Sequence, residues 1–203
     1  MTMTPPPGHP APVAGLLAWP RRDERPADAP RAPTGPGRIL VGGVGYTNLR
    51  DRSLGPLLIE RLQARSWPAD VVVEDLSYGP IDVLFTLQAE LSGFRLGLFV
   101  SAVARGRPAG TVERSVWQAP TPSVEELQAR IAEAVTGVVS LENLLLILGH
   151  FGALPTQTVI IEVEPEAEER WGPELSDAAR AALDQAEALI LHEVSLDLGV
   201  RDG

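Results

Sequence analysis

The segment from Arg38 to Pro56 constrains the fold more than any other part of this 203-residue chain. It starts with a short apolar run that ends in three closely spaced glycines, Gly42, Gly43 and Gly45. A polar loop follows, and the apolar residues of the next stretch, 54–62, recur at helical spacing. This order predicts a buried parallel strand, a sharp turn where glycine frees the backbone, and an amphipathic helix.

Strand and helix signals alternate along the rest of the chain. Ser123 and Glu126 form a capping box at the start of one helix, and Ser176 is positioned to cap the last one. Strands are predicted over 38–44, 70–74, 95–103, 111–118 and 157–164, with helices over 54–65, 80–91, 123–135 and 142–150 and from Ser176 onward. Short loops between such elements predict a three-layer α/β/α sandwich with a mostly parallel sheet of about five strands.

The length of the chain fits one domain, which is predicted over residues 37–197 between two tails. Residues 1–36 hold ten of the 19 prolines and show no periodic pattern, so they are expected to be disordered, and 198–203 form a short C-terminal tail. The apolar hexamer at 15–20 within the first tail has two interpretations. It either lies loosely on the domain or docks into a groove of a partner.

Composition excludes several classes of function. The formal net charge of -10 disfavours binding to nucleic acid through a basic surface. The chain has no cysteine, which excludes disulfides, thiolate metal sites and a cysteine nucleophile. No apolar run reaches the length of a membrane span, and the first residues do not form a signal peptide, so we expect no membrane insertion and a cytoplasmic location.

Candidate binding residues gather in the loops that follow the predicted strands. In a parallel sheet the loops at the carboxyl ends of the strands converge, so the loops 45–55, 75–79 and 101–110 are expected to meet. The candidates are Asp51, Arg52, Asp75, Ser101, Arg105, Arg107 and Glu142. No confident catalytic residue is among them, because no histidine is placed by sequence to activate Ser101, and the glycines at 42–45 lack the rest of a dinucleotide fingerprint.

In order and spacing, these segments resemble the nickel-iron hydrogenase maturation endopeptidases. The matching residues are Asn48 and Asp51 after the glycine turn, Asp75 and Asp82, Ala102-Val103 with Pro108 to Thr111, Val163-Glu-Pro165, and Leu175-Ser176. The resemblance implies an α/β fold and an enzyme that trims the C-terminal extension of a hydrogenase large subunit. It also implies three protein groups that hold the nickel of that substrate: an acid after the first aspartate, a carboxylate ending the third strand, and a histidine before the fourth helix.

The chain departs from that pattern at all three positions. They hold Arg52, Ser101 and a histidine-free segment near Val139. Arginine cannot ligate a metal, because its guanidinium stays protonated and offers only hydrogen-bond donors. Asp51, Asp75, Glu142 and His150 are the residues that could rebuild a site, although Asp51 and Asp75 also suit turns or helix caps and His150 suits a surface position. No cofactor and no metal site are predicted.

Two functional hypotheses follow from the resemblance and its departures. The first is a catalytically impaired, protease-like pseudoenzyme that binds a nickel-iron hydrogenase large subunit or its precursor as an assembly factor. Arg52, Arg105 and Arg107 would then face an acidic partner surface. The alternative is an active endopeptidase that removes the C-terminal extension, in which case the nickel of the substrate would take part.

Overall fold

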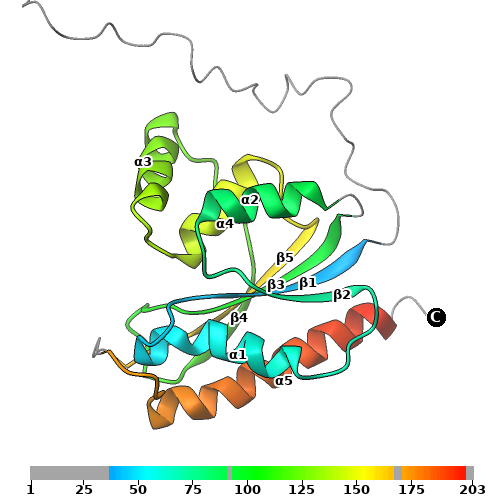
Figure 1. Ribbon diagram of the computed structural model, residues 1–203, viewed down its shortest axis with the longest axis vertical. Coiled ribbons are helices and arrows are strands. Elements are labelled where there is room, and N and C mark those ends of the chain that lie inside the picture. The colour runs from blue at the N-terminus through cyan, green and yellow to red at the C-terminus, as the bar shows by residue number, and fades with distance from the viewer. Residues whose placement is uncertain (1–36, 91–92, 167–170, 200–203) are drawn as a thin grey trace, which may run out of the picture. The chain divides into compact units, whose positions relative to one another are not determined.

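The computed structural model describes residues 37–90, 93–166 and 171–199, which form an α/β domain with helices on both faces of a sheet (Figure 1). The predicted tail over 1–36, its apolar hexamer at 15–20, and residues 200–203 lie outside these ranges. The prediction of disorder in the first tail therefore stays a prediction.

The sheet has five strands in the order β2-β1-β3-β5-β4. The strands are β1 (Arg38–Val44), β2 (Val71–Asp75), β3 (Phe94–Ala102), β4 (Val112–Val116) and β5 (Gln157–Val163). The first four in this order run parallel, and β4 pairs antiparallel with β5 at the edge. β3 lies at the centre and is almost fully buried, as is typical of a parallel strand that is covered on both faces.

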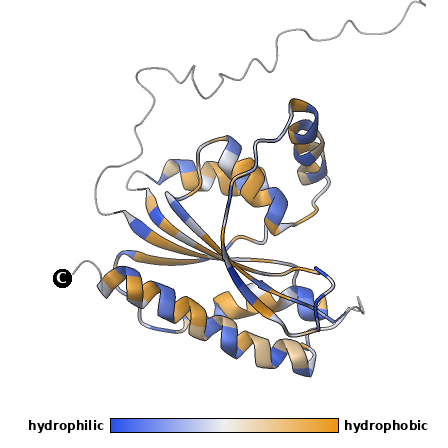
Figure 2. Cartoon of the chain, turned by 180° about the vertical axis from the view of Figure 1, so that it is seen from behind, coloured by the Kyte–Doolittle hydropathy of each residue, from blue (hydrophilic) through white to orange (hydrophobic). Residues whose placement is uncertain are grey.

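Two layers of helices cover the sheet. The described helices are α1 (Leu54–Gln63), α2 (Pro80–Ala89), α3 (Val124–Val135), α4 (Leu141–His150) and α5 (Asp177–Gly199), with a 3-10 turn, η2 (Arg50–Ser53), before α1. Helices α1 and α5 lie on one face, and α2, α3 and α4 lie on the other (Figure 1). Each layer encloses its own apolar core against the strands (Figure 2). The predicted three-layer sandwich is therefore confirmed.

Glycines bring α1 unusually close to β1. A Cβ atom added at Gly43 would lie 2.6 Å from the carbonyl oxygen of Gly55, and one added at Gly55 would lie 2.8 Å from the backbone nitrogen of Val44. Either distance is shorter than a carbon atom tolerates, so only hydrogen fits between helix and strand. This contact fixes the start of α1, and the η2 turn before it, against the carboxyl end of β1.

All residues of β5 after Gln157 are buried, because β3 and β4 flank the strand and helices cover it. α5 continues to Gly199, beyond the predicted domain end at 197. None of the helices within the described ranges combines the length and apolar character needed to cross a bilayer.

Candidate functional site

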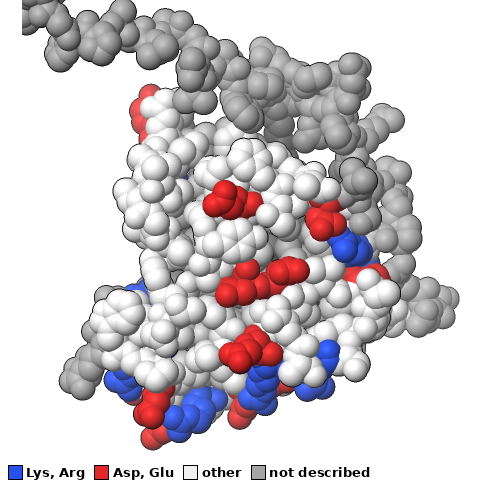
Figure 3. Space-filling view, in the orientation of Figure 1, with Lys and Arg blue, Asp and Glu red and all other residues white. Residues whose placement is uncertain are grey.

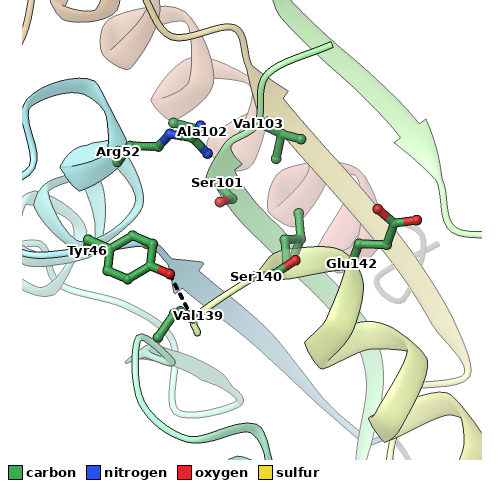
Figure 4. A pocket seen from close by; sticks show the side chains of 10 residues that line it. Tyr46, Arg52, Ser101, Ala102, Val103, Val139, Ser140 and Glu142 are labelled. Carbon is green, nitrogen blue, oxygen red and sulfur yellow. Dashed lines mark hydrogen bonds between the residues drawn. The ribbon is translucent and has the colours of Figure 1, made fainter. Parts of the chain in front are cut away.

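A small pocket opens beyond the carboxyl ends of the two central strands β1 and β3 (Figure 4). Val44 of β1 pairs with Ser101 of β3, so the two strands end side by side at the same edge of the sheet. The loops that follow them lie on two sides of the pocket, which has a volume of about 90 Å³. The beginning of α4 closes its third side. Its lining residues are Gly45, Tyr46, Arg52, Ser101, Ala102, Val103, Val139, Ser140, Leu141 and Glu142.

Arg52 brings a positive charge into this pocket from the η2 turn. Its backbone is held at both ends, since its carbonyl accepts from the Tyr46 N–H at 3.0 Å and its own N–H donates to the Leu49 carbonyl at 3.0 Å. The half-buried side chain extends toward Ser101 (Figure 4). The guanidinium therefore projects from a fixed turn.

Ser101 faces Arg52 from the end of β3. The residue is 5% exposed, and the strand pairs it with Val44 on one side and Glu162 on the other. Its side chain lines the pocket, where its hydroxyl can donate and accept hydrogen bonds (Figure 4).

The remaining polar wall comes from Tyr46 and the start of α4. The Tyr46 hydroxyl accepts a hydrogen bond from the Val139 N–H at 2.9 Å, which ties the α3–α4 connection to the first loop (Figure 4). Ser140 caps α4 by accepting from the Asn143 N–H at 3.4 Å. Glu142 is exposed at the rim, 3.8 Å from Arg105.

The chemistry of this lining suits an anion better than a metal ion. Arg52 and the Ser101 hydroxyl both donate hydrogen bonds, and the start of a helix favours negative charge. No group of three histidine, aspartate or glutamate side chains is close enough to hold a metal ion within residues 37–90, 93–166 and 171–199. The four candidates for a rebuilt site, Asp51, Asp75, Glu142 and His150, are therefore not brought together.

Asp51, next to Arg52 in the chain, is a structural residue and not a lining residue of the pocket. It is buried, and its carboxylate accepts from the Glu166 N–H, the Ser176 N–H and the Ser176 hydroxyl, each at 2.8 Å. The Ser176 hydroxyl also caps α5 by accepting from the Ala179 N–H at 3.1 Å. The carboxylate thus ties η2 to the segment between β5 and α5.

Arg105 and Arg107, which the sequence analysis placed opposite an acidic partner surface, form ion pairs within the protein. Both pair with Glu162, a buried carboxylate in β5, at 2.7 Å and 3.3 Å, and Arg107 also pairs with Glu113. Burial by itself would raise the pKa of Glu162, but the hydrogen bonds and charges of the two arginines outweigh it and hold this pKa below its ordinary value. The two arginines therefore neutralise the buried negative charge of Glu162.

Asp75 lies apart from the pocket, although its loop touches the first one. Ser77 accepts from the Gly45 N–H at 3.1 Å, whereas Asp75 accepts from the Ser77 N–H and lines a second hollow of about 350 Å³ beside Asn48 and Pro56. Exposed acids gather along this β2 side of the molecule (Figure 3). The loop 45–55 therefore contacts the loop 75–79 through Ser77 and shares the pocket with residues 101–103, whereas Asp75 does not line the pocket.

No protein-family model matches the chain, and a search of curated proteins finds no match, but solved structures do match. The hydrogenase 2 maturation peptidase from Thaumarchaeota archaeon SCGC_AB-539-E09 is 26% identical, with a TM-score of 0.55 over 78% of this chain and 99% of that one. The hydrogenase maturating endopeptidase HybD from E. coli is 22% identical, with a TM-score of 0.56 over 77% and 91%. HybD from Thermococcus kodakarensis is 17% identical, with a TM-score of 0.52 over 76% and 97%.

The chain has the fold of the hydrogenase maturation endopeptidases. The predicted resemblance is confirmed at the level of structure, across about three quarters of the chain. Arg52, Ser101 and the segment near Val139, which the sequence resemblance aligned with the three nickel-holding positions, line one pocket in this maturation-endopeptidase fold.

Sequence reasoning missed two polar residues of the pocket. Ser140 carries a recognisable signal, since it stands three residues before Asn143 at the start of an apolar run and suits an N-cap. Tyr46 carries none, because its hydroxyl bonds to a residue 93 positions away.

Proposed function

We propose that this protein binds the large subunit of a nickel-iron hydrogenase, or the precursor of that subunit, as an assembly factor without cleaving it. The proposal is supported by one observation above others: Arg52 and Ser101 line the pocket where the family resemblance implies carboxylates. The shared fold supports a hydrogenase large subunit as the partner, whereas Arg52 and Ser101 argue against nickel-dependent cleavage of that subunit.

The physical argument concerns the nickel carried by the substrate. A transition-metal ion needs two or three nitrogen or oxygen donors at about 2.0 to 2.2 Å. A guanidinium offers no lone pair, and it repels the ion by about 4 kcal/mol per unit of ion charge at 4 Å for an effective dielectric near 20. Ser101 supplies a neutral hydroxyl in place of an anionic ligand.

An active endopeptidase is the second candidate. It is favoured by the 26% identity to a hydrogenase 2 maturation peptidase over 99% of that chain. Cleavage by this protein would require donors outside the described residues or from the substrate itself.

Coexpression with the cognate large-subunit precursor separates the two candidates. The precursor is purified with and without this protein, and intact mass spectrometry compares its C-terminus, while affinity purification of a tagged copy reports binding. We expect a complex and an unchanged mass. A shortened precursor that depends on this protein would refute the binding role and establish the endopeptidase.

A further inference from the structure

The sheet ends on one side at β2, whose outer edge pairs with no other strand of the described residues. The Leu76 N–H donates to the Gly43 carbonyl at 2.8 Å, which fixes the phase of the parallel ladder between β2 and β1. The even-numbered residues of β2 therefore bond toward β1, and the backbone groups of Val73 and Asp75 point outward. An outer edge of this kind is a template for one more strand.

The outward backbone groups of β2 are only partly occupied. The Gln63 side chain donates to the Val73 carbonyl at 3.0 Å, in agreement with the outward direction of this carbonyl. The N–H groups of Val73 and Asp75 have no hydrogen-bond partner within residues 37–90, 93–166 and 171–199. Two donors on alternate residues match the spacing of the carbonyls in an added extended segment.

A hollow of about 350 Å³ adjoins this edge, because Gln63 and Asp75 are among its lining residues. Pro56 and Leu57 of α1 give it apolar walls, and Glu60 and Asp75 bring carboxylates to it. Lysine and arginine side chains suit such a space, because their alkyl stems pack against apolar surface while their charged ends stay with polar groups or water.

The charge of the edge selects its occupant. Glu60, Glu74 and Asp75 are exposed, and none of them forms an ion pair within the part of the chain that the structure describes. They belong to the acids that gather on the β2 side of the molecule (Figure 3). This charge disfavours nucleic acid and anionic lipid, and it disfavours the β2 edge of a second copy because like charges across two paired strands repel. A basic segment is the complementary occupant.

We propose that the outer edge of β2 binds an extended, basic segment of a partner protein as an added strand, with a lysine or arginine side chain in the hollow beside α1. The N–H groups of Val73 and Asp75 supply backbone hydrogen bonds, and Glu60 and Glu74 supply opposite charge. This surface is separate from the pocket at Arg52, and its occupation does not depend on the proposed assembly role.

Four peptides test the charge and the strand pairing. The basic probe is acetyl-Thr-Lys-Val-Arg-Thr-Lys amide, whose basic residues share one face when it is extended, and the acidic probe has glutamate in their place. The other two are the basic probe N-methylated on one or the other set of alternate amides, since only one set can face β2. Each is titrated into the isotope-labelled full chain to the millimolar range. We expect saturable NMR shifts at the amides of Val73 and Asp75 with the basic probe, none with the acidic probe, and loss of binding for one methylated probe only.

Variants connect the shifts to the named groups. Val73→Pro removes an outward N–H that bonds to no neighbouring strand, and it should weaken binding about fivefold or more. Combined Glu60→Gln and Glu74→Gln should weaken binding about threefold or more, as expected for two exposed charge contacts. Glu125→Gln, which removes an exposed acid from α3 on the other face of the sheet, should leave the affinity unchanged (Figure 1). Amide spectra without peptide show whether each variant folds, and the methylated probes test the same backbone pairing on the natural chain if Val73→Pro does not.

Several results would overturn the surface. These are equal binding of the acidic probe, equal effects of the two methylated probes, shifts that avoid β2, or absence of saturable binding by the basic probe. A dimer in sedimentation velocity whose formation perturbs the β2 amides would assign the edge to a second copy, and CaCl₂ that displaces the peptide at constant ionic strength would assign the carboxylates to a cation. The probes carry no hydrogenase sequence, so their failure is independent of complex formation with the large subunit.

Discussion

Replacement of Asp51 by alanine tests the structural role of the aspartate that precedes Arg52. The change removes the three hydrogen bonds of 2.8 Å that the Asp51 carboxylate accepts, and Asp51 is only 5% exposed. Hydrogen bonds to a charged group contribute about 1.5–3 kcal/mol each, and bonds that share one acceptor do not add fully. We therefore expect Asp51→Ala to lower the free energy of unfolding by about 3–5 kcal/mol, a large part of the stability of an ordinary domain.

Urea unfolding at neutral pH, followed by far-UV circular dichroism, measures this change. Asp177→Ala is the matched control, because Asp177 lies beside Ser176 at the start of α5 but its side chain is fully exposed, and its midpoint should stay where it is. A loss below about 1 kcal/mol for Asp51→Ala would refute the structural role. If the expected loss occurs, failure of this variant in a cleavage assay would report instability and would not identify a catalytic group.

Three further predictions concern the buried ion pairs, the helix contact and the pocket. The pKa of Glu162 is lowered in the folded protein, so the stability that its ion pairs contribute is complete above its ordinary value of 4.5. This stability is lost as the pH falls through the lower pKa of the folded state. Glu162→Gln should therefore weaken the acid dependence of stability, measured by urea unfolding at pH 3 to 7. Gly43→Ala places a carbon against the backbone of α1 and should cost about 1–3 kcal/mol or more, whereas Gly199→Ala, with open space around it, should be tolerated in thermal unfolding. Arg52→Glu combined with Ser101→Asp should create measurable Ni²⁺ binding by calorimetry that the natural chain lacks, and equal Ni²⁺ affinity in both proteins would contradict the donor argument.

The elements of the fold were predictable because their signals are local. The capping box at Ser123 is present, with the Glu126 N–H donating to the serine hydroxyl at 3.1 Å and the glutamate accepting from the Ser123 N–H at 2.8 Å. The direction of β4 had no such signal, since its antiparallel pairing with β5 depends on the path of residues 103–111 and not on its own sequence.

The site was predictable only in part, because its side chains are oriented by distant partners. The loops around Arg52 and Ser101 were located by the strand ends, which a parallel sheet brings together. The pairing of Arg105 with Glu162 joins residues 57 positions apart, and that of Asp51 with Ser176 joins residues 125 apart. Neither pairing follows from spacing or periodicity, so the sequence could name these residues without saying which of them face the pocket.

The glycine contact between β1 and α1 has a consequence for how this scaffold can acquire new chemistry. Backbone meets backbone at Gly43 and Gly55, so the height of the helix start above the sheet is set without help from the side chains of η2. A carboxylate and a guanidinium at position 52 would consequently leave from the same point in space. The backbone contact therefore fixes the position of the side chain at residue 52 whatever its chemistry. A single substitution at this residue can reverse the charge of the pocket while the fold stays intact.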